Sequence, residues 1–173
     1  VVVVAIDMTL SGESPYPANI QDANYGVRWL KSKAREWNAD GSSVGIYGNP
    51  LQDENCARDW GTVIDKAHLF KTNIVCGFAG AVEGKPMDQS MPRYKQVFGE
   101  LQKRAADKGV KIAFENCDMG GWWHDVKWNI AHSPTAWEMM FDAIPSENIG
   151  LQWEPCHQMV SLIDPLTQLR KYA

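Results

Sequence analysis

Short apolar runs alternate with longer amphipathic segments along the chain. The runs have the length of buried strands, and the segments between them place apolar residues at helical spacing. This pattern predicts five strands, at residues 1–8, 43–47, 72–76, 110–115 and 149–153. It predicts helices at residues 21–37, 53–70, 91–108 and 133–143, a final helix from 164 onward, and a long aromatic loop at 118–132.

Strand and helix alternate five times, at spacings of roughly 30 to 40 residues, the length of a strand–helix–strand unit. Such alternation is typical of an α/β protein with a parallel sheet and right-handed crossovers. The spacing alone leaves open whether the sheet is doubly wound or closed into a barrel. No G-x-G-x-x-G turn and no P-loop is present, and functional-looking residues at several strand ends favour the barrel.

The composition is that of an ordinary globular protein, with 173 residues, 45% hydrophobic content, 22% charged content and a net charge of −4. We expect a single domain over residues 1–173. A basic stripe and an apolar run of membrane-spanning length are both missing, which argues against nucleic acid and membranes as partners. The four cysteines form no C-x-x-C pair, so we expect reduced thiols in a cytoplasmic protein.

A carboxylate follows each of two successive predicted strands. Glu115 ends the run at 110–115, and Glu154 follows the run at 149–153. The carboxyl ends of parallel strands meet at one edge, which is where α/β proteins carry their active sites. Two carboxylates that converge there predict a site for a hard divalent cation.

Five motifs lie at or just after the predicted strands, namely Tyr47-Gly48-Asn49-Pro50-Leu51, Phe78-Ala79-Gly80, Ile112-Ala113-Phe114-Glu115-Asn116-Cys117, Trp128-Asn129-Ile130-Ala131-His132-Ser133-Pro134 and Trp153-Glu154-Pro155-Cys156-His157-Gln158. Together they resemble the sugar phosphate isomerase/epimerase family, the xylose isomerase-like TIM barrels. The last two motifs are long and specific, whereas Gly-Asn-Pro-Leu alone would be weak.

The resemblance implies a parallel (β/α) TIM barrel that is incomplete in this chain, which would cover strands two to six as about five βα units. A full barrel of this kind takes ~250 residues. The strands at 1–8 and 149–153 would then be open edges. We expect polypeptide outside this sequence, or another chain, to cover them; a homo-oligomer is one such arrangement.

The family holds a divalent metal with four side chains, and two of those positions map here, onto Glu115 and Glu154. Their oxygen ligands favour Mg²⁺ or Mn²⁺ over Zn²⁺ or Co²⁺. Cys117 and Cys156 each follow one of these glutamates by two residues, so a cysteine-containing zinc site is the alternative. His157 matches the family's substrate-facing histidine.

The implied reaction is isomerisation or epimerisation of a small carbohydrate by proton transfer beside a carbonyl, through an enediolate. Glu115 would act as metal ligand and base at once, and His157 would hold a substrate hydroxyl or the developing oxyanion. Trp122 and Trp153 would cover the apolar faces of the sugar. Asn49 suits substrate contact and turn formation equally well.

Two other functions remain open. The chain would be a non-catalytic sugar-binding or fragment protein if it held only half of a metal site. It would be a hydrolase if it belonged to the family's endonuclease branch, but the acidic charge and the lack of a basic stripe disfavour that class. Further strands that end in the family's remaining His and Glu ligands would decide for the enzyme.

Overall fold

The computed structural model describes residue 36 and residues 43–122 and 124–172. The chain divides into two units, Val1–Ser42 and Ser43–Ala173, and the helices and strands described below belong to the second. The predicted strand at 1–8 and nearly all of the predicted helix at 21–37 lie outside the described residues. The expectation of a single domain over residues 1–173 therefore stays a prediction.

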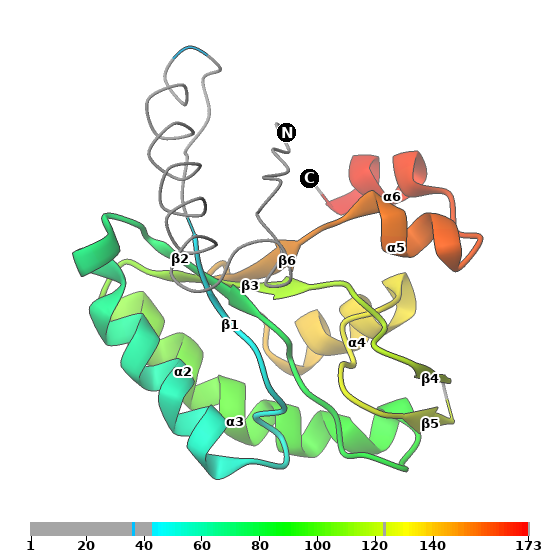
Figure 1. The fold of residues 1–173 in the computed structure, drawn as a ribbon, viewed down its shortest axis with the longest axis horizontal. Coiled ribbons are helices and arrows are strands. Elements are labelled where there is room, and N and C mark those ends of the chain that lie inside the picture. Colours follow the sequence, from blue (N-terminus) through cyan, green and yellow to red (C-terminus); the bar gives the residue numbers. More distant parts are fainter. Residues whose placement is uncertain (1–35, 37–42, 123, 173) are drawn as a thin grey trace, which may run out of the picture. The chain divides into compact units, whose positions relative to one another are not determined.

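Four parallel strands form the sheet (Figure 1). The strands are β1 (Val44–Ile46), β2 (Ile74–Gly77), β3 (Lys111–Glu115) and β6 (Ile149–Gln152), and they lie side by side in that order. Neighbours in the sheet are thus also successive strands of the predicted βα units. The parallel order that the alternation predicts is confirmed for these four strands.

Three helices pack against one face of the sheet: α2 (Glu54–Lys66), α3 (Met87–Asp107) and α4 (Pro134–Ala143) (Figure 1). A 3₁₀ turn, η1 (Ala67–Phe70), extends α2, and Asp53 caps α2 by accepting a hydrogen bond from the Asn55 N–H. Ser133 caps α4, with Pro134 at its first position, as the sequence predicts.

Aromatic rings join this helical layer to the sheet. The Phe114 ring of β3 meets the Phe98 ring of α3 edge-on, at 4.8 Å between centroids. Trp60 of α2 and Tyr94 of α3 contact the same two rings, and all four side chains are fully buried. Because side chains alternate along a strand, burial of Phe114 against the helices turns its neighbour Glu115 to the opposite face of the sheet.

The backbones of β1 and β2 approach closely at Gly77. A β-carbon at this position would lie 1.9 Å from the Ile46 carbonyl oxygen, well inside any real contact. Glycine is therefore required where β2 delivers the chain to the carboxyl edge of the sheet.

Three elements differ from those that the sequence predicts. Helix α3 begins at Met87 rather than Met91, with Pro92 inside it, because a proline in the first turns of a helix costs few hydrogen bonds. The expected loop at 118–132 contains a small antiparallel hairpin, β4 (Gly121–Trp122) and β5 (Asp125–Val126). A short helix, α5 (Pro155–Val160), follows β6 directly and precedes the expected final helix, α6 (Pro165–Tyr172).

In the part of the chain that the structure describes, no helix combines the length and apolar character needed to cross a membrane. The longest, α3, has one buried face and an otherwise polar surface.

Candidate active site

The carboxyl ends of β3 and β6 lie next to each other, and both present polar side chains to the face of the sheet opposite helices α2, α3 and α4. Glu115 of β3 pairs in register with Gln152 of β6. The Gln152 amide donates a hydrogen bond to Glu154 Oε1 at 3.2 Å. Gln152 therefore contacts the carboxylate of Glu154 and pairs through its backbone with Glu115. The two glutamates that the sequence predicts to converge thus come from adjacent strand ends.

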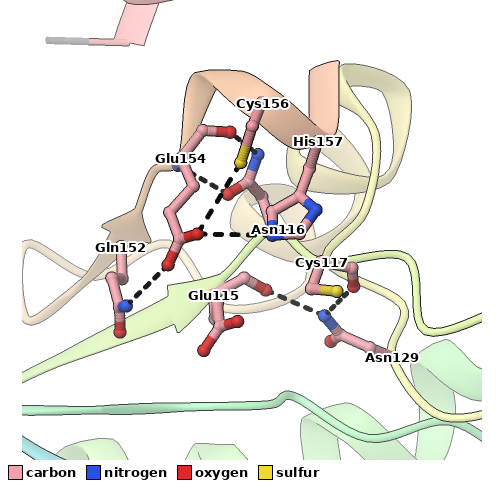
Figure 2. A network of polar contacts seen from close by, with 8 residues as sticks. All are labelled: Glu115, Asn116, Cys117, Asn129, Gln152, Glu154, Cys156 and His157. Atoms are coloured by element: carbon pink, nitrogen blue, oxygen red, sulfur yellow. Dashed lines mark hydrogen bonds and ion pairs between the residues drawn. The ribbon is translucent and has the colours of Figure 1, made fainter. Parts of the chain in front are cut away.

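Glu154 is the N-cap residue of α5, and Pro155 begins the helix. Its side chain makes no capping bond to the helix backbone, so the carboxylate is available to other groups. His157, one turn into the helix, places Nε2 at 3.3 Å from Glu154 Oε2. The Cys156 thiol lies 3.9 Å from the same oxygen. Figure 2 shows the three side chains together at the start of α5.

Asn116 holds the two strand ends together. Its amide nitrogen donates to the Glu154 carbonyl at 2.9 Å, and its amide oxygen accepts from the Glu154 N–H at 2.7 Å (Figure 2). The Asn116 side chain is fully buried. These bonds extend the pairing of β3 and β6 beyond the last ladder residues. They also fix the Glu154 backbone, and with it the starting position of the Glu154 side chain.

Asn129 performs a similar task for the other strand ends. Its amide nitrogen donates to the carbonyls of Glu115, at 2.8 Å, and Cys117, at 2.7 Å. Its amide oxygen accepts from the N–H groups of Ala79 and Ala131. This fully buried side chain therefore ties the segment after β3 to the segment after β2.

The electrostatics of the site centre on Glu115, which is 9% exposed. Burial raises the pKa of this carboxyl, and the negative charge of Glu154 raises it further, against smaller opposing effects of Tyr47 and His157. The Tyr47 hydroxyl is hydrogen-bonded to Glu115. Burial of that hydroxyl and the charge of Glu115 raise the pKa of Tyr47 to about 12.

Two groups of potential metal ligands meet at His157. One consists of Glu115, Cys117 and His157, and the other of Glu154, Cys156 and His157. Within each group the ligand atoms all lie within 4.8 Å of one another. Carboxylate oxygens from both strand ends thus lie around one imidazole, an arrangement that suits a divalent cation.

The structure places Glu115 and Glu154 each in a ligand group with His157, and the roles that the sequence assigns to these three residues stay predictions. Trp153 packs against the hydrophobic core, and its indole N–H is buried without a hydrogen-bond partner among the described residues. Trp122 lies in β4, and its side chain is outside what the structure describes. The contacts that these tryptophans would make with a sugar stay predictions.

Asn49 uses its whole amide group to order the loop after β1. The nitrogen donates to Gln52 and to the Ala81 carbonyl, and the oxygen accepts from the N–H groups of Leu51 and Ala81. Of the two roles left open for Asn49, these bonds favour the turn, and nothing tests its contact with a substrate.

Three residues of the site have no role in the sequence-based prediction: Tyr47, Asn116 and Gln152. Tyr47 and Asn116 belong to the motifs named above, but within those motifs the sequence assigns the main roles to Asn49 and Glu115. Gln152 is the residue of β6 that pairs with Glu115, and its amide oxygen is buried without a partner among the described residues. Alternation along the strand, which places Gln152 on the face of Glu115, is the signal that could have identified it.

Solved structures support the fold. The chain is similar to the probable 3-DHS dehydratase AsbF of Bacillus anthracis, with 16% identity and a TM-score of 0.60, over 88% of this chain and 55% of that chain. It is similar to an L-ribulose 3-epimerase, with 18% identity and a TM-score of 0.59, over 85% and 51% of the two chains. A D-allulose 3-epimerase from Methylomonas sp. matches with 18% identity and a TM-score of 0.51, over 78% and 49%.

The chain spans about half the length of these structures. At such identities the likeness establishes the fold alone. A comparison with curated proteins found no significant match.

Two family models match the sequence. A model described as BD-FAE matches residues 1–50, mostly outside the described residues and less than half of the chain. The second matches residues 37–171, which include all four strands of the parallel sheet and the site at their carboxyl ends. Over these residues the chain belongs to the xylose isomerase-like TIM barrel family.

Proposed function

We propose that this protein is a metal-dependent sugar isomerase or epimerase that transfers a proton beside a carbonyl group. The observation that carries the proposal is the meeting of Glu115 and Glu154 at His157, at the carboxyl edge of a xylose isomerase-like sheet. The structural relatives include proteins described as sugar 3-epimerases, which supports a sugar-modifying enzyme in general.

The residues present fit a divalent cation. Each glutamate lies within 4.8 Å of the His157 imidazole in a ligand group of its own, and burial together with the charge of Glu154 raises the pKa of Glu115, a cost that a bound cation would offset. Glu115 and Glu154 would hold the ion. When bound, it would polarise the substrate carbonyl and stabilise the enediolate.

Glu115 is the proposed base. Its side chain faces the site from a strand whose other face is locked into the aromatic core, so its position is fixed before substrate arrives. A pKa that is raised by burial brings a carboxyl closer to the operating pH, where a base both accepts and returns a proton efficiently. The hydrogen bond from Tyr47 orients the carboxyl further.

His157 is proposed to contact a substrate hydroxyl or the oxygen on which negative charge develops. Its Nε2 atom faces Glu154, which would orient the ring. Trp122 and Trp153 are proposed to line the sugar-binding side. Asn49 is a weaker candidate for contact with the sugar, because its amide already forms hydrogen bonds within the loop and to Ala81.

Proton exchange tests this proposal across many sugars at once. The protein would be incubated in D₂O with Mn²⁺ or Mg²⁺ and a panel of ketoses and aldoses, and NMR would follow loss of the C–H signal beside the carbonyl. At least one sugar is expected to exchange, and Glu115→Gln should slow the exchange by roughly 100-fold or more. Glu100→Gln is the matched control, because Glu100 is an exposed residue of α3 that pairs with Lys103 on the same helix.

Exchange that persists in Glu115→Gln at the rate of the parent protein would refute the assignment of the base. Sugar binding without any exchange would favour the non-catalytic alternative. The endonuclease alternative draws no support from the site, and the net charge of −4 opposes it. A cytoplasmic location is part of the proposal, supported by four cysteines that are all free thiols.

A further inference from the structure

Tyr47, which directly follows β1, lies on the same face of the sheet as Glu115. Gly45 of β1 pairs with Cys76 of β2, and Cys76 pairs with Ala113 of β3. Because side chains alternate along a strand, the residue two positions after Gly45 and the residue two positions after Ala113 share one face, and these residues are Tyr47 and Glu115. The Tyr47 hydroxyl donates a hydrogen bond to Glu115, so it reaches from the first strand of the sheet past the end of the second to the proposed base.

Three contacts hold the Tyr47 side chain in place. Its ring packs edge-to-face against the Phe78 ring, at 5.1 Å between centroids and 74° between the ring planes. It also lies over β1, where a β-carbon at Gly45 would come within 3.1 Å of Tyr47 Cε2. Glycine at this position therefore leaves the space that the ring occupies. Together with the hydrogen bond to Glu115, these contacts fix the orientation of both the ring and the hydroxyl.

Most of Tyr47 nevertheless faces solvent. The residue is 59% exposed, whereas Phe78, against which it packs, is 7% exposed. An exposed aromatic ring whose orientation is already fixed is a preorganised contact surface, because a ligand that packs on it requires little further ordering of the protein. The hydrogen bond to Glu115 places this surface at the proposed site.

We propose that Tyr47 contacts the sugar directly, with its exposed ring packed against C–H groups of the substrate and its hydroxyl bonded to Glu115. This inference rests on the proposed function, to which it adds a substrate-contacting residue from the end of β1. The face of an aromatic ring carries partial negative charge, so it attracts the slightly positive C–H groups that a sugar presents between its hydroxyls. One side chain would thereby fix the distance between the proposed base and the carbon that loses a proton.

The tryptophans near the site differ from Tyr47 in their surroundings. Trp153 packs against the hydrophobic core. Trp128 is exposed, but it belongs to the loop between β5 and α4 rather than to a strand end of the parallel sheet. Among the aromatic residues of the described chain, exposure and a hydrogen bond to the proposed base coincide at Tyr47.

Two substitutions separate the ring from the hydroxyl. Tyr47→Phe keeps the ring and removes the bond to Glu115, whereas Tyr47→Leu removes both. Each variant would be assayed by proton exchange in D₂O, with the sugar of the ketose and aldose panel that exchanges fastest in the parent protein. KM should rise by roughly fivefold or more in Tyr47→Leu and by less than about twofold in Tyr47→Phe, because binding depends on the ring. The kcat should fall in both variants, because both release the Glu115 carboxyl.

Tyr172→Phe is the matched control. The Tyr172 hydroxyl of α6 donates to Glu138 Oε1 of α4 at 2.9 Å, so this variant also removes a phenol hydroxyl from a Tyr–Glu pair, and KM and kcat should stay at the parent values. Saturation-transfer NMR gives a readout without turnover, since irradiation of the aromatic protons of the protein labels sugar C–H groups that contact a ring. The label should fall at least roughly twofold in Tyr47→Leu and persist in Tyr47→Phe.

The outcomes separate this inference from the function on which it rests. An unchanged KM and an unchanged label in Tyr47→Leu would overturn the contact and leave the proposed isomerase standing. An equal rise of KM in Tyr47→Phe and Tyr47→Leu would also overturn it, because the ring would then not be what binds the sugar. A label that depends on Tyr47, without exchange of any sugar, would overturn the isomerase and support the contact. The absence of both exchange and label for every sugar of the panel would overturn both.

Discussion

Asn116 and Glu154 form a reciprocal pair in which the amide of one side chain bonds both the N–H and the carbonyl of the other residue's backbone, at 2.7 and 2.9 Å. The pair joins the ends of β3 and β6 beyond their last ladder residues. One buried side chain therefore adds to the β3–β6 ladder in fixing the spatial relation of the two proposed metal-binding strand ends (Figure 2).

Replacement of Asn116 by Ala is predicted to lower the free energy of unfolding by about 1–3 kcal/mol, because it leaves two backbone groups of Glu154 without partners. It should also weaken cation binding, because the Glu154 backbone, which positions the carboxylate, would no longer be held by the Asn116 side chain. Chemical denaturation and metal titration would measure the two effects. Asn55→Ala, at an exposed position of α2, should change stability by no more than about 0.5 kcal/mol. Equal effects of the two variants would contradict the prediction.

Glu115→Gln is predicted to stabilise the metal-free protein at neutral pH. Burial and the charge of Glu154 raise the pKa of Glu115, so ionisation of this carboxyl disfavours the folded state. The cost is absent below the pKa of the unfolded chain and grows as the pH rises through the higher pKa of the folded state. Glutamine does not ionise and keeps an oxygen for the Tyr47 hydroxyl.

Urea denaturation of both proteins at several pH values, in the presence of a chelator, tests this sign. The stability advantage of the variant should be present at neutral pH and disappear in acid. A variant that is less stable at neutral pH, or a difference that does not vary with pH, would count against the electrostatic account of Glu115.

Gly77→Ala is predicted to destabilise the fold by roughly 1–3 kcal/mol or more, because the new β-carbon would lie 1.9 Å from the Ile46 carbonyl oxygen and force β1 away from β2. Gly150→Ala, in β6, is the matched control, since its β-carbon would meet no atom within 4 Å. Thermal unfolding of the two variants should differ clearly, and similar melting temperatures would show that the close approach is not structurally required.

The sequence pattern predicts the parallel sheet well because buried strands and helical spacing are local signals. The strands β1, β2, β3 and β6 lie where the apolar runs are, and α4 begins at the predicted Ser133-Pro134. The hairpin of β4 and β5 could not be predicted, since two residues per strand carry no periodicity and their pairing depends on the surrounding loop.

The same division holds for the site. Glu115, Glu154 and His157 could be proposed from their places at strand ends and from motifs. The fixing roles of Asn116 and Asn129 depend on backbone groups up to 50 residues away, which no local pattern encodes. The same limit applies to His157 as the residue shared by both ligand groups, because it follows from the turn of α5.

Glu115 and Glu154 are proposed to hold one divalent cation together. The most direct test is isothermal titration calorimetry of the parent protein, of Glu115→Gln and Glu154→Gln, and of the double variant. The account predicts one ion per chain. It predicts an affinity loss of at least roughly tenfold in each single variant, and a double variant less impaired than the sum of the two losses, because both act on one ion. Glu100→Gln should bind as the parent protein does. Full affinity after removal of either glutamate would contradict the account.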